Sequence, residues 1–195
     1  MNTPDKLRAA PRRRLRAIAR GTGRWLWNGL AVVGLLSVIY FGGFDLSQIV
    51  SGSMTPTLQG EGGPDGDWVL AERVSFWFRE PRRWEVVQFH TPDHMLVAKR
   101  VVGLPGETVS LVDHQVAIGG TVMTKPVNVS HLSYLPYGNV SQDRSVACGT
   151  GYYVLGDETR DSFDSRFDGP VPPERICGRA WLIVWPPSRI GFVNP

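Results

Sequence analysis

The residues best suited to chemistry are a serine on a tight turn and a lysine inside an apolar strand. Ser53 lies in the run Ser-Gly-Ser-Met-Thr-Pro-Thr-Leu at 51–58, and Lys99 lies in Met-Leu-Val-Ala-Lys-Arg-Val-Val at 95–102. A serine hydroxyl is a weak nucleophile until a neighbouring base takes its proton. An amine serves as that base only when it is neutral, so this pairing predicts a lysine whose pKa is lowered by burial.

The free energy needed to keep that lysine neutral is modest. Buried lysines reach pKa values of about 5–6, against about 10.4 in water. A fall to about 8 requires about 3 kcal/mol of desolvation, at about 1.36 kcal/mol per pKa unit. Arg100 cannot take the role, because its guanidinium does not deprotonate. Two alternatives stay open: a histidine base from elsewhere in the chain, and an ordinary turn with a strand lysine whose amine reaches water.

The serine run, together with Lys-Arg-Val-Val-Gly-Leu-Pro-Gly-Glu at 99–107, resembles the motifs of the type I signal peptidases. These are membrane-anchored serine proteases with a Ser-Lys dyad, and the resemblance extends from about Ile49 to the end of the chain. It implies Ser53 as nucleophile, Lys99 as general base, and an oxyanion hole made by the Ser51 hydroxyl and the Ser53 backbone amide. We expect the pocket for a small substrate side chain to be lined by Ile49, Met54, Leu58, Val69 and Ala98.

A third block, Gly-Asp-Glu-Thr-Arg-Asp-Ser-Phe-Asp-Ser-Arg at 156–166, resembles the family's Gly-Asp-Asn-Arg-Asp-Asn-Ser-x-Asp-Ser-Arg. By this resemblance Ser162 orients the lysine amine, and Asp164 and Arg166 form a structural ion pair. The front half departs from the pattern, since Glu158 stands where Asn is usual. Arg160 and Asp161 therefore receive no role from the resemblance.

The same acidic block could instead bind calcium. Its carboxylates lack the alternating ligand register of an EF-hand, and its arginines would compete for them. His90 and His94 stand four residues apart, but Pro92 between them argues against a helical metal site. We expect no metal and no cofactor.

Charge is concentrated at the N-terminus. Residues 1–24 carry eight cations and one acid, and residues 25–44 carry no formal charge. Twenty residues at about 1.5 Å each span about 30 Å, one hydrocarbon core. We expect a cytoplasmic tail at 1–24, a transmembrane helix at 25–44 and an extracytoplasmic catalytic domain at 45–195. A cleavable secretory signal is the rival, but no Ala-x-Ala site follows the apolar run. A buried soluble helix and a nucleic-acid-binding tail are further alternatives.

The remainder of the chain reads as short strands separated by Gly- and Pro-containing turns. We predict a mainly β domain with antiparallel sheets, with strands at 68–71, 85–89, 96–102, 108–112, 116–118, 152–155 and 180–185. Cys148 and Cys177 are expected in an oxidising compartment, where they form either a disulfide or two separate thiols. The run Phe76–Phe78 is either core or a surface that enters the membrane interface.

These observations predict an integral membrane endopeptidase that removes signal peptides from exported preproteins. The resemblance implies substrates with small residues at positions −1 and −3, and no nucleic-acid partner. We expect the chain in the cell membrane, spanning it once. Since Ser53 lies only a few residues after the span, the nucleophile would stay near the bilayer surface. The alternatives are a peptidase dedicated to one pilin or conjugation system, a self-cleaving repressor, and an inactive relative that acts as a chaperone.

Overall fold

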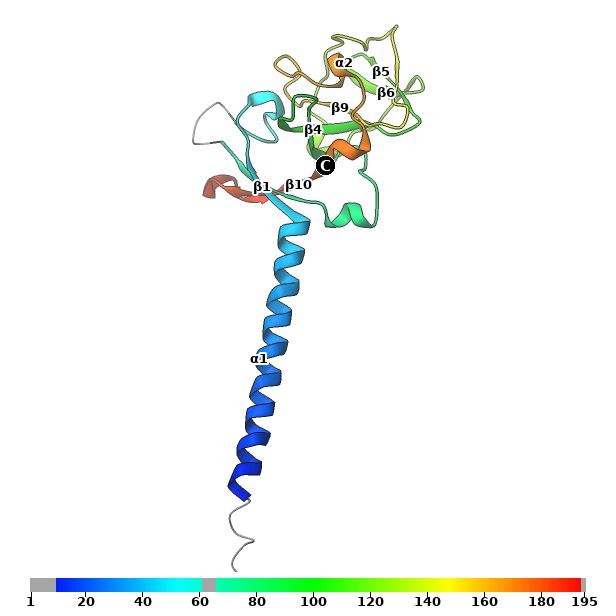
Figure 1. Cartoon of the computed structure of the whole chain (residues 1–195). Helices are drawn as coiled ribbons and strands as arrows, with labels where there is room; N and C mark the ends of the chain where they lie inside the picture. Colours follow the sequence, from blue (N-terminus) through cyan, green and yellow to red (C-terminus); the bar gives the residue numbers. More distant parts are fainter. Residues whose placement is uncertain (1–9, 61–65, 194–195) are drawn as a thin grey trace, which may run out of the picture. The chain divides into compact units, whose positions relative to one another are not determined.

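The structure is a computed structural model that describes residues 10–60 and 66–193, with side chains from residue 24 onward. The chain divides after Gly43 into two compact units, a single helix and a strand-rich unit that begins at Phe44. Figure 1 shows both units, coloured along the sequence.

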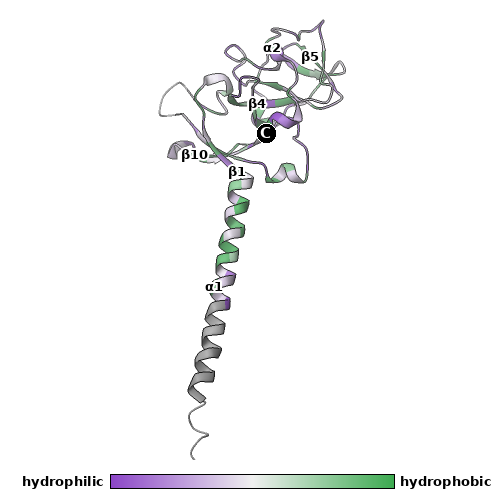
Figure 2. Ribbon diagram, viewed as in Figure 1, coloured by the Kyte–Doolittle hydropathy of each residue, from purple (hydrophilic) through white to green (hydrophobic). Residues whose placement is uncertain are grey.

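The helical unit consists of α1, Ala10–Gly43. This helix begins well before the predicted span, because its first part is rich in Ala, Arg and Leu, which are good helix formers. The segment Arg24–Gly43 has 20 residues and a mean hydropathy of 1.6, so its length and composition suit a membrane crossing. Figure 2 shows hydrophobic residues along most of the part of α1 that it colours.

The larger sheet of the strand-rich unit is antiparallel throughout its paired strands. Its order is β1-β2-β10-β3-β4-β9, and β11 also pairs with β10. The strands are β1 (Phe44–Gln48), β2 (Trp68–Glu72), β3 (Val86–His90), β4 (Leu96–Gly103), β9 (Tyr153–Leu155), β10 (Ile176–Trp185) and β11 (Gly191–Phe192).

The second sheet has the order β7-β6-β5-β8 and is also antiparallel. Its strands are β5 (Thr108–Val112), β6 (Gln115–Ile118), β7 (Thr121–Val122) and β8 (Val146–Ala147), and the short helix α2 spans Ser165–Asp168. One apolar core joins the two sheets, since Val109 and Leu111 of β5 pack with Val102 of β4 and Leu155 of β9. The predicted mainly β fold is therefore confirmed, and every predicted strand is present.

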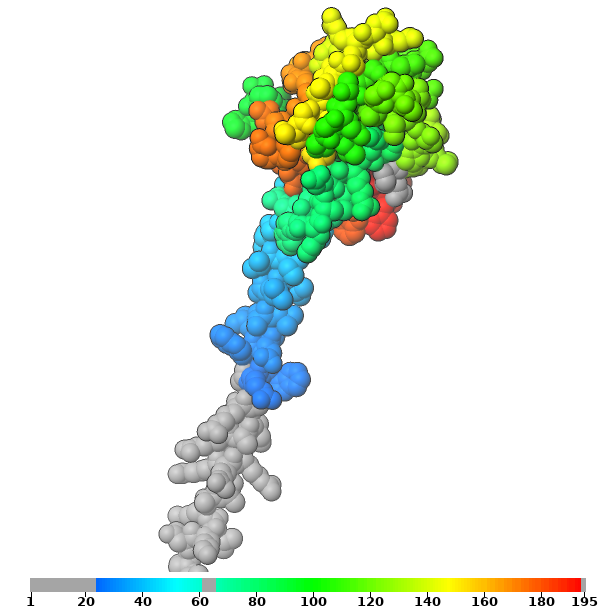
Figure 3. All heavy atoms as spheres, turned by 90° about the vertical axis from the view of Figure 1, so that its right-hand side faces the viewer, coloured from blue at the N-terminus to red at the C-terminus, as the bar shows by residue number. Residues whose placement is uncertain are grey.

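The aromatic run at 76–78 is divided: Phe76 is partly buried and packs against the core, whereas Trp77 and Phe78 lie on the surface. It belongs to the 3-10 turn η2, Val74–Trp77, and the residue after it. Trp77 is 55% exposed and Phe78 is 84% exposed. The space-filling view in Figure 3 shows this blue-green segment on the outside of the strand-rich unit.

Candidate active site

Ser53 lies on a 3-10 turn, η1 (Gly52–Met54), which follows the end of β1 by a few residues. The amide of Thr55 donates to the carbonyl oxygen of Gly52 at 2.9 Å and closes this turn. The turn is anchored on one side, because the amide of Ile49 donates to the carbonyl oxygen of Asp67 at 2.8 Å. Ser53 is buried, so its hydroxyl is held within the protein rather than on a mobile surface loop.

Lys99 lies in β4, where its register partner on β3 is Val87. Only 4% of its surface is exposed. Its Nζ lies 2.5 Å from the hydroxyl oxygen of Ser53, within hydrogen-bonding distance. The structure thus brings together the two residues that the sequence paired across 46 positions.

Burial lowers the pKa of Lys99 to about 8 from the ordinary 10.5. The carboxylates of Asp164 and Asp157 oppose this effect by favouring the charged amine, and Arg166 adds to it. Desolvation outweighs the two carboxylates because each of them already faces a buried arginine. Near pH 7 about a tenth of the amine is therefore uncharged and able to accept a proton, and this fraction reaches about a half near pH 8.

Ser51 is exposed beside the dyad, with its Oγ 3.3 Å from the Oγ of Ser53. The hydrogen bond that closes the turn is donated by the amide of Thr55, so it does not use the backbone amide of Ser53. Both groups are donors suited to a developing oxyanion. Their assignment to an oxyanion hole stays a prediction.

The five residues predicted to line the substrate pocket lie together. Ile49, Met54, Leu58, Val69 and Ala98 all belong to one apolar cluster, which also contains Val86 and Ile183. The cluster includes the residue after Ser53 and the residue before Lys99, so it borders the dyad. Its apolar character suits a small aliphatic side chain, and that use stays a prediction.

Asp164 and Arg166 form an ion pair at 2.8 Å with both side chains fully buried. The hydroxyl of Ser162 donates to Asp164 Oδ2 at 2.7 Å. A hydroxyl that donates in this way keeps its oxygen lone pairs for another donor, such as a lysine ammonium. The lysine-orienting role of Ser162 stays a prediction, and its hydroxyl is held in place by Asp164.

Gly156 separates Ser162 from the nucleophile turn and has room for nothing larger than hydrogen. A Cβ at this position would lie 2.1 Å from Ser162 Oγ and 2.6 Å from the carbonyl oxygen of Ser53. Two residues later, the amide of Glu158 donates to that same carbonyl oxygen at 3.1 Å. The block at 156–166 therefore packs directly against the backbone of Ser53.

Sequence reasoning missed a second buried ion pair. Arg100 contacts Asp157 at 2.7 Å, and both side chains are fully buried. Thr57 donates to Asp157 Oδ2 and accepts from Arg100 Nη2 at 3.0 Å. The sequence drew attention to each residue only through its neighbour: Arg100 follows Lys99, and Asp157 follows Gly156.

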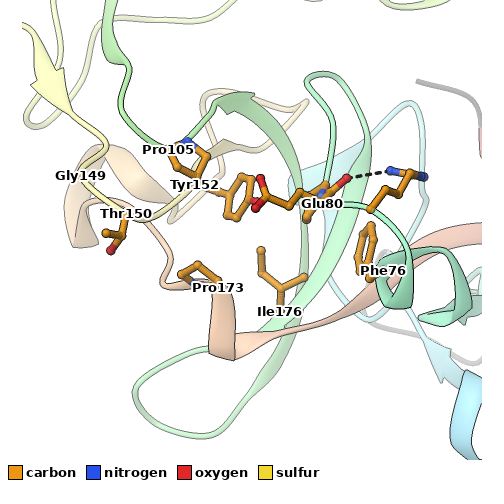
Figure 4. A pocket seen from close by; sticks show the side chains of 10 residues that line it. Phe76, Glu80, Pro105, Gly149, Thr150, Tyr152, Pro173 and Ile176 are labelled. Atoms are coloured by element: carbon orange, nitrogen blue, oxygen red, sulfur yellow. Dashed lines mark hydrogen bonds between the residues drawn. The ribbon is translucent and has the colours of Figure 1, made fainter.

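A further hollow of the strand-rich unit, of about 470 Å³, contains neither dyad residue. Figure 4 shows its lining, with the rings of Phe76 and Tyr152 and the side chains of Pro173 and Ile176 around Glu80. Arg79, its cation, is held by the carboxylate of Glu85 at 2.7 Å. This hollow offers no activated nucleophile.

The two cysteines are free thiols in different surroundings. Cys148 is buried in the core between the sheets. Cys177 is partly exposed, and its Sγ lies 3.0 Å from Nδ1 of His90. Of the two possibilities that the sequence left open, the structure has the separate thiols.

Residues 22–185 match the family model described as signal peptidase, peptidase S26. The chain belongs to this family. Signal peptidase I of Leptolyngbya laminosa is 32% identical over 183 residues, covering 87% of this chain and 85% of the relative. Signal peptidase I V of Bacillus subtilis strain 168 is 36% identical over 135 residues, covering 65% of this chain and 77% of the relative.

Among solved structures, the crystal structure of a signal peptidase I from Enterococcus faecalis V583 matches 52% of this chain and 97% of its own. The identity is 29% and the TM-score is 0.42. The S26 match includes Ser53, Lys99 and the block at 156–166, so the residues of the candidate site lie inside the family region.

Proposed function

We propose that Ser53 and Lys99 are the catalytic dyad with which this S26 signal peptidase removes signal peptides from exported preproteins. The observation that carries the assignment is the 2.5 Å contact between a buried amine and a serine hydroxyl. Such a contact meets the distance requirement for proton transfer from nucleophile to base. The lowered pKa of the amine increases the neutral fraction that can act as the base.

In the acylation step, Ser53 Oγ attacks the carbonyl carbon of the scissile bond and its proton moves to Lys99 Nζ. The carbonyl oxygen becomes an oxyanion, and the Ser51 hydroxyl and Ser53 amide are the donors we assign to it. The tetrahedral intermediate then collapses. Lys99, now an ammonium, gives its proton to the leaving amine, which becomes the N-terminus of the mature protein.

In deacylation, a water molecule gives its proton to Lys99 and attacks the ester carbon. The proton returns to Ser53 Oγ as the signal peptide leaves with a free carboxylate. No step requires more than one base, because Lys99 alternates between the neutral and protonated forms.

Specificity for small side chains at −1 and −3 is the finer part of the proposal. It is supported by the apolar cluster that contains Met54, Leu58 and Ala98 beside the dyad. Both relatives described above are named signal peptidases. This does not favour the alternative of a peptidase dedicated to one pilin or conjugation partner.

We also propose that the segment 24–43 crosses the cell membrane once, with the basic N-terminus in the cytoplasm and the strand-rich unit outside. Support comes from the length and hydropathy of this segment and from the eight cations that precede or begin it. Protease added to intact spheroplasts should digest the strand-rich unit and leave an N-terminal tag protected. Protection of the strand-rich unit would reverse the orientation.

The test of function uses the full chain in detergent with a panel of preproteins, and the new N-termini are sequenced. Ser53→Ala and Lys99→Ala should abolish processing with unchanged circular dichroism. Ser130→Ala and Lys125→Ala are matched controls, since Ser130 donates to the Val127 carbonyl and Lys125 to the Leu132 carbonyl. Full activity of Lys99→Ala would contradict the dyad.

A further inference from the structure

The groove beside the nucleophile carries unpaired negative charge. It has a volume of about 430 Å³, and its lining includes Ser51, Gly52, Glu158 and Asp161. The groove is open to solvent, since Asp161 is exposed and Glu158 is partly exposed. The groove therefore places two carboxylates beside the residues that directly precede Ser53.

These carboxylates are not neutralised within the described part of the chain. The seven ion pairs recorded there include neither Glu158 nor Asp161. Glu158 Oε1 accepts only a backbone amide, that of Arg160, at 3.2 Å. The two other acids of the block, Asp157 and Asp164, are fully buried against arginines. The negative charge at this groove is thus available to a ligand.

Two observations fix this charge close to the reacting atoms. Glu158 and Asp161 form the acidic wall of the groove. The amide of Glu158 donates to the carbonyl oxygen of Ser53 at 3.1 Å, so this wall is hydrogen-bonded to the backbone of the nucleophile. The charge of Asp161 also acts on the amine of Lys99, where it favours the protonated form. The acidic wall and the dyad therefore belong to one cleft.

The groove and the apolar cluster share no residue. Ile49 belongs to the apolar cluster, whereas the next residue, Val50, lines the groove. Ile49 is 9% exposed and Val50 is 67% exposed, so the two side chains have different surroundings. If the apolar cluster receives the side chains before the cleaved bond, the acidic groove receives those after it.

We propose that this acidic groove binds cationic side chains in the first residues of the mature protein, and that Glu158 and Asp161 determine this preference. The inference rests on the proposed function, which supplies the direction of the substrate. Both positions hold Asn in the signal-peptidase motif that the block resembles, so the preference comes from this chain's own residues. The new ammonium that cleavage generates would also be attracted to this groove.

The test uses two internally quenched peptides with Ala at −3 and −1, identical except for Lys or Glu at +2. The full chain in detergent should cleave the Lys peptide with a kcat/KM about 3- to 10-fold higher at low salt, as expected for partly exposed ion pairs. The ratio should fall toward 1 in about 0.5 M salt, because screening is strong at that ionic strength. The same Lys/Glu exchange at −5 is the positional control and should give a ratio near 1.

The double variant Glu158→Gln/Asp161→Asn should bring the Lys/Glu ratio at +2 close to 1, whereas the exposed-acid control Glu174→Gln should keep it. A ratio near 1 in the unmodified protein, an unchanged ratio in the double variant, or a larger ratio at −5 than at +2 would each overturn the groove assignment. These outcomes leave the proposed function intact. Failure of the unmodified protein to cleave any of the four peptides or any preprotein would overturn both.

Discussion

Arg100 and Asp157 form an ion pair that is completely shielded from solvent, at 2.7 Å. Arg100 follows Lys99 on β4, and Asp157 follows Gly156, which packs against the Ser53 carbonyl. Thr57, four residues after Ser53, contacts both partners. This pair therefore joins the nucleophile turn, the lysine strand and the block at 156–166.

Removing one member of this pair should destabilise the protein. Asp157→Asn leaves the Arg100 guanidinium buried without a counter-charge, and we expect a loss of about 3–5 kcal/mol in the free energy of unfolding. Urea unfolding of the detergent-solubilised chain measures it. The exposed-acid control Asp143→Asn should change stability by less than about 0.5 kcal/mol. Loss below about 1 kcal/mol in Asp157→Asn would show that the pair does not join these segments.

The activity should depend on pH through Lys99. Because the amine must be neutral, kcat/KM should rise with pH through an apparent pKa of about 8. Asp161→Asn removes a charge that favours the ammonium, so the rise of kcat/KM should move to lower pH. Rate profiles between pH 6 and 10 on a peptide with Ala at +2 test both expectations. If the rise of kcat/KM in Asp161→Asn stays at the same pH or moves to higher pH, Asp161 does not act on the base.

Lys99 should reduce stability at neutral pH. Its pKa is lower in the folded than in the unfolded chain, so the unfolded chain binds more protons between about pH 8 and 10.5 and wild-type stability rises with pH across that window. Below pH 8 the whole cost is present, up to about 3 kcal/mol. Lys99→Met should therefore raise the free energy of unfolding at pH 7, and the gain should shrink by pH 10. Equal stability of the two proteins at pH 7 would contradict the lowered pKa of Lys99.

Gly156 should tolerate no side chain. Gly156→Ala places a Cβ against Ser162 Oγ and the Ser53 carbonyl, both of which must shift. Since displacement of about 1 Å at an active site can reduce rates by about 100-fold, we expect a loss of that order in kcat with a smaller change in KM. Gly191→Ala is the matched control, because its nearest neighbour lies at 3.9 Å. Retained kcat in Gly156→Ala would argue that this block does not position the nucleophile.

The sequence predicted the elements whose signal is local. Alternating and apolar runs located the seven predicted strands, and the long uncharged run located the apolar part of α1. The sequence did not reveal β1, because Phe44–Gln48 comes directly at the end of the apolar run and Phe44 was interpreted as part of the membrane span. β7 and β8 have two residues each, which is too short for any periodic pattern.

The dyad was predictable because both residues lie in distinctive runs. The Arg100–Asp157 pair was not, since its members are 57 residues apart and only the tertiary fold determines their contact. An arginine in an apolar strand indicates that a counter-charge exists without indicating where. The acidic wall was visible as a departure from the family motif, but its position beside Ser51 and Gly52 came from the structure.

The most direct measurement is a titration of the Lys99 amine itself. The chain has only three lysines, Lys6, Lys99 and Lys125. In protein labelled with 13C at lysine Cε, the signal absent from the Lys99→Ala spectrum belongs to Lys99, and its shift follows protonation of the amine. We predict a midpoint near pH 8. A Lys99 signal that still reports the fully protonated amine above pH 9.5 in the folded enzyme would contradict the proposed base.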